Sequence, residues 1–166
     1  MAKPLNLAFD PIARAGDLWE RRWGHSPAML AVTSIMRAQA ILIAELDALL
    51  RPYELTFARY EALVLLTFSS RGALPLGKMG ERLQVHPTSV TSIVNRLEAA
   101  GHVVRRRHPR DGRAVLAEIT AQGRAVVEAA TSDLVNARFA IADISTEDLR
   151  AISALLRPVR ESAGDF

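Results

Sequence analysis

Cysteine is absent from the 166 residues of this chain. Without thiols there is no disulfide, no thiolate metal site and no cysteine-based redox sensor, and the composition fits a reducing compartment. Aromatic residues are scarce, at 5% of the sequence, whereas apolar residues of all kinds make up 49%. We therefore expect a core of aliphatic side chains, in one domain or in a compact domain with an added dimerising element.

Signals for export and for membrane insertion are also missing. The first residues, MAKPLNLAFDP, contain no apolar stretch of the kind that a secretory signal requires. The longest apolar candidate, AMLAVTSIMRAQAILIAEL, is interrupted by Arg37, and no uncharged apolar run reaches the roughly 18 residues of a spanning helix. The sequence therefore predicts a soluble, cytoplasmic protein without a membrane partner.

The motifs of common enzyme and metal sites are not present. The sequence has no G-x-S-x-G, H-E-x-x-H, P-loop or G-x-G-x-x-G in a strand-turn-helix setting. Its histidines, at positions 25, 86, 102 and 108, are scattered and form no cluster with acidic residues. We expect no enzyme activity, no catalytic residues, no metal site and no cofactor.

Positive charge, by contrast, is concentrated in one segment. Between His102 and Arg113 there are five arginines and one acid, which gives these 12 residues a charge of +4. The whole chain carries only +3, so the other 154 residues carry −1. Such local basicity favours an anionic partner, although a solvated basic loop would have the same charge.

Helical signals dominate on both sides of this segment. Hydrophobic spacing and capping residues predict helices over residues 10–24, 27–50, 56–69 and 122–140, and a last helix that begins at Ser145. The helix over 27–50 is apolar on more than one face, as a buried or interface helix must be. We therefore expect a mainly α fold in which this helix is covered.

Two short helices, over residues 76–83 and 87–100, precede the basic segment. A three-residue turn separates them, and Pro87 suits the first position of the second helix. That helix has an apolar stripe at positions 90, 93, 94 and 97. Its opposite face carries short polar and basic side chains without an acid: Thr88, Ser89, Thr91, Ser92, Asn95 and Arg96. This pattern is typical of a helix-turn-helix whose second helix enters the major groove of DNA.

The polar face suits base recognition. Short hydroxyl side chains permit a close approach, Asn can pair with adenine, and Arg can pair with guanine. His86, at the N-terminus of the helix, is expected to cap it or to contact a phosphate. An ordinary exposed face is the alternative, but such faces usually mix Glu and Lys.

The basic segment is predicted to be a β-hairpin. Alternating apolar residues indicate strands over 102–107 and 114–120, and Asp111-Gly112 is a strong turn signal. A helix-turn-helix followed by an arginine-rich hairpin is a winged helix, whose tip can enter the minor groove. The sequence leaves open which of Arg110 and Arg113 does so. The expected DNA contacts from the hairpin are Arg105, Arg107, Arg110 and Arg113.

Together these residues resemble the MarR family of winged-helix transcriptional regulators. LRPYELT at 50–56 is similar to the family's junction between its first two helices, and TSVTSIVNRLEAAGHVVR at 88–105 is similar to its recognition helix and entry to the wing. Pro109, Asp111 and Arg113 match the wing pattern P-x-D-x-R. The helix over 10–24 is extra to the minimal family plan.

The resemblance implies a homodimer with interlocked terminal helices and two recognition helices in successive major grooves of a pseudopalindrome. It also implies that Asp111 pairs with Arg113 to shape the wing tip. The expected architecture is mainly α with a small β-wing. N-terminal dimerisation helices would occupy residues 1–50, a winged helix-turn-helix domain 51–121, and C-terminal dimerisation helices 122–166.

Members of this family typically bind a small aromatic or carboxylic effector between the dimerisation helices and the winged domain. The candidates for contacting an anionic or aromatic effector are Trp19, Arg37, Arg59 and Tyr60. An arginine within an apolar helix needs a partner, which for Arg37 is Glu45, Glu61 or an anionic ligand. The alternative is that these residues only pack and that no natural effector exists.

The sequence thus predicts a ligand-responsive repressor that binds double-stranded DNA specifically. The alternative is a dimeric protein-interaction or small-ligand-binding module without specific DNA binding. Such a module would retain the helices but would not need an arginine-rich wing beside an acid-free helix face.

Overall fold

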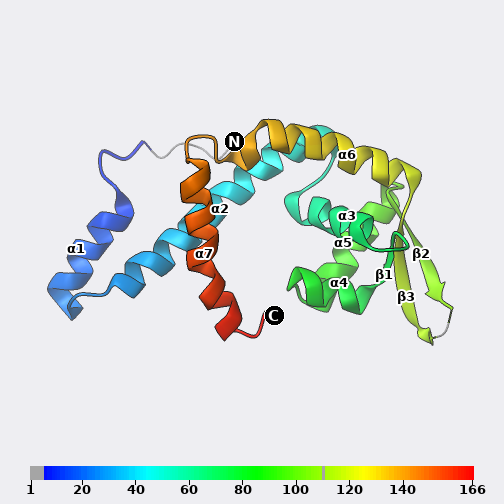
Figure 1. The fold of residues 1–166 in the computed structure, drawn as a ribbon, viewed down its shortest axis with the longest axis horizontal. Helices are drawn as coiled ribbons and strands as arrows, with labels where there is room; N and C mark the ends of the chain where they lie inside the picture. Colours follow the sequence, from blue (N-terminus) through cyan, green and yellow to red (C-terminus); the bar gives the residue numbers. More distant parts are fainter. Residues whose placement is uncertain (1–5, 110) are drawn as a thin grey trace.

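The chain is mostly helical and carries one small sheet. A computed structural model describes residues 6–109 and 111–166, apart from the side chains of residues 111–113. The elements in chain order (Figure 1) are α1 (Pro11–Trp23), α2 (Pro27–Leu50), η1 (Arg51–Tyr53), α3 (Phe57–Phe68), β1 (Ala73–Pro75), α4 (Leu76–Leu83), α5 (Pro87–Ala99), β2 (Val103–His108), β3 (Asp111–Ile119), α6 (Ala121–Asn136), η2 (Arg138–Ala140) and α7 (Thr146–Ser162). This order confirms the predicted fold class.

Local capping explains where four of these helices begin. Asp10, Ser26, Thr56 and Ser145 each place a side-chain oxygen within 3.4 Å of a backbone N–H in the first turn of α1, α2, α3 and α7. A proline follows the cap in α1 and α2, where its missing N–H costs no helical hydrogen bond. The predicted helix starts are therefore confirmed.

The sixth helix ends earlier than the sequence predicted. The expected helix over 122–140 stops at Asn136, because Arg138, Phe139 and Ala140 have positive φ angles of 47°, 51° and 60°. This left-handed conformation costs an L-residue roughly 1–2 kcal/mol. The Arg138 guanidinium holds the turn by donating to two backbone carbonyls of the following residues, at 2.9 and 3.0 Å. The segment η2 is thus a strained joint between α6 and α7.

The buried core lies in one part of the molecule. Every buried residue that the structure describes falls between Leu46 and Leu134, and residues 46–136 are termed the head. Its core joins the last turn of α2 to α3, α4, α5, the sheet and α6. Leu63 and Leu66 of α3 have no exposed surface. Burial of one leucine side chain stabilises a fold by about 1.5–3 kcal/mol. Because many such side chains are buried together here, the head has its own hydrophobic core.

The sheet has the strand order β1-β3-β2, with both pairs antiparallel. Its hairpin turn lies two residues earlier than the sequence predicted. A register shift after Arg107 brings His108 opposite Asp111, so β2 and β3 continue further than expected. Asp111 and Gly112 therefore begin β3, and the connection falls at 109–110, of which residue 110 lies outside the described residues.

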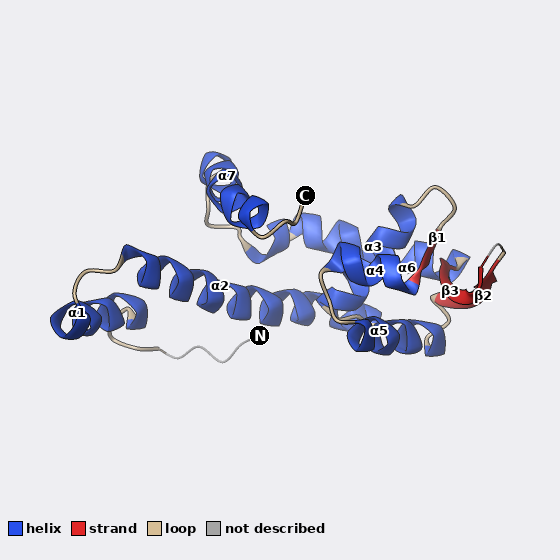
Figure 2. Cartoon of the chain, turned by 90° about the horizontal axis from the view of Figure 1, so that it is seen from below, coloured by secondary structure: helices blue, strands red, loops and turns tan. Residues whose placement is uncertain are grey.

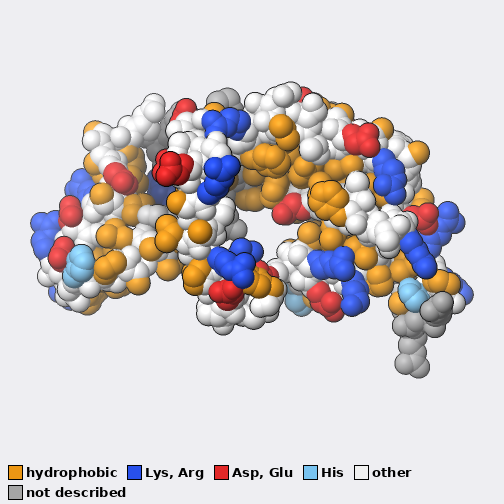
Figure 3. All heavy atoms as spheres, viewed as in Figure 1, with side chains coloured by type: hydrophobic (Ala, Val, Ile, Leu, Met, Phe, Trp, Pro, Cys, Tyr) orange, Lys and Arg blue, Asp and Glu red, His pale blue; other side chains and the backbone are white. Residues whose placement is uncertain are grey.

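Outside the head, the described helices contain no buried residue. Residues 11–45 and 146–162 are termed the arm, which comprises α1, most of α2, and α7. α1 and α7 contain no buried residue, and the buried residues of α2 are Leu46 and Leu50, in the head. Figures 1 and 2 show α1 and the start of α2 extending far from the head, and Figure 3 shows apolar side chains over this surface. The exposed large apolar residues of the arm include Leu18, Trp23, Val32, Ile35, Met36, Ile41, Ile152, Leu155 and Val159.

The helix α2 meets the length and hydropathy criteria of a membrane span, although the sequence contains no uncharged apolar run of that length. With η1 it forms one helical segment, Pro27–Tyr53, that is long and apolar enough to cross a membrane, and an 18-residue window within it has a mean hydropathy of 1.5. The isolated charge of Arg37 does not lower that average enough to exclude it. One such helix is weak evidence of a membrane span, and of its residues only Leu46 and Leu50, near its C-terminal end, are buried in the head.

Candidate nucleic-acid interface

The polar face of α5 is exposed, as the sequence predicted. Val90, Val94 and Leu97 are at most 1% exposed, and they hold α5 against the core. The predicted contact residues Thr88, Ser89, Thr91, Ser92, Asn95 and Arg96 are all exposed. α5 contains a single acidic residue, Glu98, near its C-terminal end. The exposed face therefore presents hydroxyl, amide and guanidinium groups without an acid that would repel phosphate.

The N-terminus of α5 is capped by His86. Its Nδ1 lies 3.3 Å from the backbone N of Thr88 and accepts that N–H, and Thr88 Oγ1 lies 3.1 Å from the same nitrogen. In the neutral ring the proton is then on Nε2, which is left as a donor. The predicted capping role is confirmed, and the phosphate contact stays a prediction. The exposed N–H groups and the helix dipole also favour an anion at this end.

The hairpin arginines differ in their partners. Arg105 is paired with Glu98, and Arg106 with Glu118 across the hairpin, at 3.2 Å. Arg107 is exposed and forms no ion pair within the described part of the chain. Of the other predicted contacts, residue 110 lies outside the described residues, as do the side chains of Asp111 and Arg113. Two of the basic charges are thus neutralised within the protein, which was not predicted from the sequence.

Arg105 connects the hairpin to α5. Val103, two residues earlier on β2, is fully buried, and alternation places Arg105 on the same face of the strand. Its guanidinium donates to Glu98 Oε2 and to Asn95 Oδ1, while its backbone N–H donates to Glu98 Oε1 at 3.2 Å. Glu98 and Asn95 are three residues apart and share one side of α5. The helix and the wing are therefore joined through side chains at the candidate interface.

The base of the hairpin is fixed against α6. The Thr120 hydroxyl donates to the carbonyl oxygen of Gly101 at 2.8 Å. Gly123 approaches so closely that a Cβ there would lie 2.2 Å from the carbonyl oxygen of His102. His102 is 6% exposed, and its Nδ1 has no partner in the described part of the chain. Burial lowers the pKa of His102, and the carboxylate of Glu54 partly opposes this shift. The wing therefore emerges from a closely packed base.

A second link joins η1 to α6. The Tyr53 hydroxyl donates to Asp133 Oδ2 at 2.6 Å, and this hydrogen bond raises the pKa of Tyr53. Together with the buried Leu134, the contact fixes α6 against the start of the head. This pair was not predicted from the sequence, because its members are 80 residues apart in the chain.

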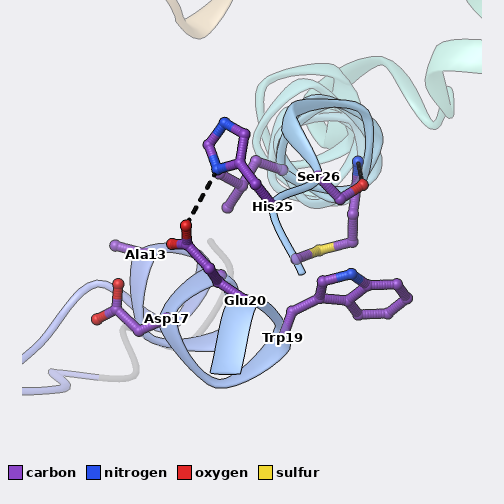
Figure 4. Close-up of a pocket in the computed structure, with 9 residues that line it drawn as sticks. Ala13, Asp17, Trp19, Glu20, His25 and Ser26 are labelled. Carbon is purple, nitrogen blue, oxygen red and sulfur yellow. Dashed lines mark hydrogen bonds and ion pairs between the residues drawn. The ribbon is translucent and has the colours of Figure 1, made fainter. Parts of the chain in front are cut away.

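Of the four predicted effector residues, Trp19 lines the cavity that the structure describes, and the other three do not. Trp19 lines a cavity of about 210 Å³ between α1 and the start of α2, together with Glu20, His25 and Met29. Figure 4 shows the Trp19 ring on one side of this cavity and His25 facing Glu20 on the other, with Nδ1 and Oε1 3.4 Å apart. Arg37 does not line the cavity. Trp19 is therefore a predicted effector residue that lines a concave surface.

The other three effector candidates have separate environments. Arg37 is half-buried on α2 and forms no ion pair or hydrogen bond within the described part of the chain. Arg59 donates to the carbonyl oxygen of Glu54 at 2.8 Å and to Thr56 Oγ1 at 3.2 Å. Tyr60 is 6% exposed in the head core, with its hydroxyl 3.0 Å from Thr131 Oγ1. Of the two candidate arginines, Arg59 therefore has hydrogen-bond acceptors, and Arg37 has none within the described part of the chain.

No group of three or more His, Cys, Asp or Glu side chains that could hold a metal ion occurs among the described residues. The site consists instead of a recognition helix with an acid-free polar face and an arginine-rich hairpin beside it. This combination defines a winged-helix DNA-binding protein.

Comparison with known proteins agrees with this class. The MarR family model matches residues 58–115. The chain is 31% identical, over 114 residues, to the organic hydroperoxide resistance transcriptional regulator of Bacillus subtilis, a match that covers 69% of this chain and 76% of that protein. The chain belongs to the MarR family of transcriptional regulators.

Solved structures show the same fold. Sco5413, a MarR family regulator from Streptomyces coelicolor, is 58% identical with a TM-score of 0.80, over 84% of this chain and 97% of that one. Sco3205, a MarR family regulator from the same organism, is 25% identical with a TM-score of 0.76, over 85% of this chain and 91% of that one. The Sco3205 structure is a complex with DNA. These relatives are transcriptional regulators and not enzymes.

Proposed function

We propose that this regulator is a cytoplasmic, ligand-responsive repressor that binds a pseudopalindromic operator as a homodimer. The observation that carries the proposal is the exposed polar face of α5, whose single acid, Glu98, lies near the C-terminal end and pairs with Arg105, beside the hairpin that holds Arg107. Membership of the MarR family and the DNA complex of Sco3205 support it. In the proposal, α5 reads bases in the major groove and the hairpin contacts the adjoining backbone and minor groove.

The arm supports the homodimer. Large apolar side chains are exposed along α1, α2 and α7, and a contiguous exposed apolar surface of this kind marks an interaction site. A second copy of the chain would cover the apolar surface of α2 and α7, so α2 need not enter a lipid bilayer. The twofold symmetry of the dimer would place its two α5 helices on the same side of the molecule. In the proposed division, residues 1–50 and 122–166 make the dimer and 51–121 bind DNA. Half-sites would then lie about one helical turn, roughly 10 bp, apart.

DNA binding can be tested without knowing the operator. Duplexes would be selected from a randomised library by the full-length protein, and the enriched duplex titrated at several salt concentrations. A dimer with about 6–10 phosphate contacts loses roughly 10³–10⁵ in affinity between 50 and 200 mM salt. Failure to enrich any sequence, or equal affinity for a random duplex, would favour the alternative of a dimeric interaction module.

The position of the charge can be tested with a matched pair of variants. Arg107→Ala removes an exposed hairpin charge, whereas Arg150→Ala removes an exposed charge from α7 in the arm. We expect Arg107→Ala to weaken binding to all duplexes and to reduce the salt slope by about 1 for each phosphate that is no longer neutralised. Arg150→Ala should leave both unchanged. Equal effects of the two variants would show that only net charge matters.

We also propose that a small aromatic carboxylate binds the arm and releases the DNA. Trp19 would contact its ring. Arg37, which does not line the cavity within a single chain, would have to move towards the carboxylate to bind it, and Arg59 and Tyr60 would have to exchange their present hydrogen bonds to take part. Because the chain has no cysteine, a thiol-based response is excluded.

Benzoate is a suitable probe of this site, read by tryptophan fluorescence and by release of the selected duplex. Trp19→Phe should abolish the fluorescence response, and Trp23→Phe should retain it, since the rings are 4.7 Å apart but only Trp19 lines the cavity. A response that depends on Trp23, or none with the wild-type protein, would argue against an aromatic carboxylate site at Trp19.

A further inference from the structure

The amide of Asn95 has a fixed orientation in the unbound protein. Its Oδ1 accepts from the Arg105 guanidinium. A guanidinium has donors and no acceptor, so only the oxygen of the amide can face it, and the reversed amide would place N–H against N–H. The Asn95 amino group is left without a partner in the described part of the chain. The side of the amide that donates is therefore turned away from the hairpin.

The charge of Arg105 is used within the protein. Glu98 accepts from both its guanidinium and its backbone N–H, the latter at 3.2 Å. The Arg105 side chain is 26% exposed, against 64% for Arg106 on the other face of the strand. Counterions leave DNA when a cationic side chain neutralises a phosphate. An arginine that is already paired with a carboxylate therefore contributes little to this release. Arg105 thus differs from Arg107, although the sequence places both in the basic segment.

We propose that Arg105 is a positioning residue that holds Asn95 for reading adenine, and that it is not a phosphate contact. A carbonyl oxygen has two lone pairs. Arg105 takes one, which leaves the second lone pair and both amino hydrogens of Asn95 for the N6 and N7 edge of adenine. Glu98 completes the arrangement by holding Arg105. This proposal rests on the proposed DNA-binding function and assigns one base position within it.

The test compares base preferences of variants on the duplex that the wild-type protein selects. Arg105→Met combined with Glu98→Gln removes the guanidinium and its counter-charge together, so net charge is unchanged. We expect loss of preference at one A·T pair in each half-site, by roughly 5- to 150-fold, with the salt slope unchanged. Asn95→Ala should lose preference at the same pair, and the triple variant should lose no more.

A second variant uses the opposite sign. Glu98→Gln alone frees the Arg105 charge, so the salt slope should become steeper and random duplexes should bind more tightly. A uniform loss of affinity with a shallower slope in the Arg105→Met and Glu98→Gln variant, as expected for Arg107→Ala, would overturn the positioning role. Wild-type preference at every base pair in that variant would also overturn it, and loss at a G·C pair would overturn the adenine assignment.

These outcomes are separate from failure of the proposed function, in which the wild-type protein selects no duplex at all. Asn95 is exposed, so Asn95→Ala keeps the test informative even if a change at Arg105 destabilises the head. Circular dichroism and thermal unfolding of each variant would detect that destabilisation.

Discussion

In the head, Leu66 has no exposed surface, whereas in the arm Leu155 keeps 75% of its surface exposed. Both are leucines on amphipathic helices, α3 and α7, and they differ in what their own chain provides to cover them. The head has helices on both sides of α3, while α7 has no buried residue. The difference teaches that the exposed face of α5 is held by a core within one chain, whereas the apolar surface of the arm is not covered within the described part of the same chain.

The largest effect is expected in the proposed dimer interface of the arm. Leu155→Asp would place a carboxylate in the proposed dimer interface twice, once from each subunit, at several kcal/mol for each buried charge. The dimer dissociation constant should rise roughly 1,000-fold or more, as measured by analytical ultracentrifugation. Ala154→Asp is the matched control, because it adds the same charge one residue away, off the apolar stripe. If both variants stay dimeric, α7 is not part of the interface.

In the head, Leu66→Ala should lower the free energy of unfolding by about 2–5 kcal/mol, because it leaves a cavity in the core. The measurement is chemical denaturation. At protein concentrations where the chain is monomeric, Leu155→Ala should change this free energy by less than about 0.5 kcal/mol. A similar decrease for both would mean that the arm packs on the head within one chain.

The stability of the head should also depend on pH, through the buried His102. Burial lowers the folded-state pKa of His102 below its ordinary value of 6.5. Around and below pH 6.5 the unfolded chain therefore binds more protons than the folded one, and stability falls as the pH falls towards the folded-state pKa. The slope is limited to about 1.4 kcal/mol per pH unit for this one group.

Unfolding free energies measured between pH 7.5 and roughly 5 would show this slope. It should be reduced in His102→Gln and retained in His25→Gln, since His25 lies beside the arm with 71% of its side chain exposed. An unchanged slope in His102→Gln would assign the pH dependence to another group.

The smallest effect is expected at the joint between the two regions. Ala140 has φ of 60°, a conformation that glycine adopts without strain. Ala140→Gly should therefore stabilise the chain, by up to about 1 kcal/mol after the greater flexibility of unfolded glycine is subtracted. Ala137→Gly, with φ of −79°, is the control and should destabilise. Thermal unfolding of the two variants would give opposite signs.

Features that depend on neighbours in the sequence were predictable. The caps Asp10 and Ser145 and the exposed face of α5 follow from local hydrogen bonding and helical spacing. The DNA-binding residues stay a prediction, because no contact with DNA is described. The effector residues were grouped by chemistry alone, and Tyr60 proved to lie in the core.

Other features depend on distant parts of the chain. Predicting the pairing of Arg105 with Glu98 requires knowing which face of β2 packs against α5. Alternation along the strand groups the residues into two faces but does not say which of them meets the helix. The hairpin turn moved because of a register shift that no residue type signals. The joint at Phe139 has no glycine or asparagine to mark its left-handed backbone.

The length of α2 has a mechanical consequence. Its 24 residues rise by 1.5 Å each, about 36 Å in all, and its last turn is buried in the head. If α2 pivots by about 5° at its N-terminal end, its C-terminal end moves by about 3 Å. This displacement is close to the 3.4 Å between successive base pairs. A small repacking among the arm helices would therefore displace α5 by nearly one base-pair step.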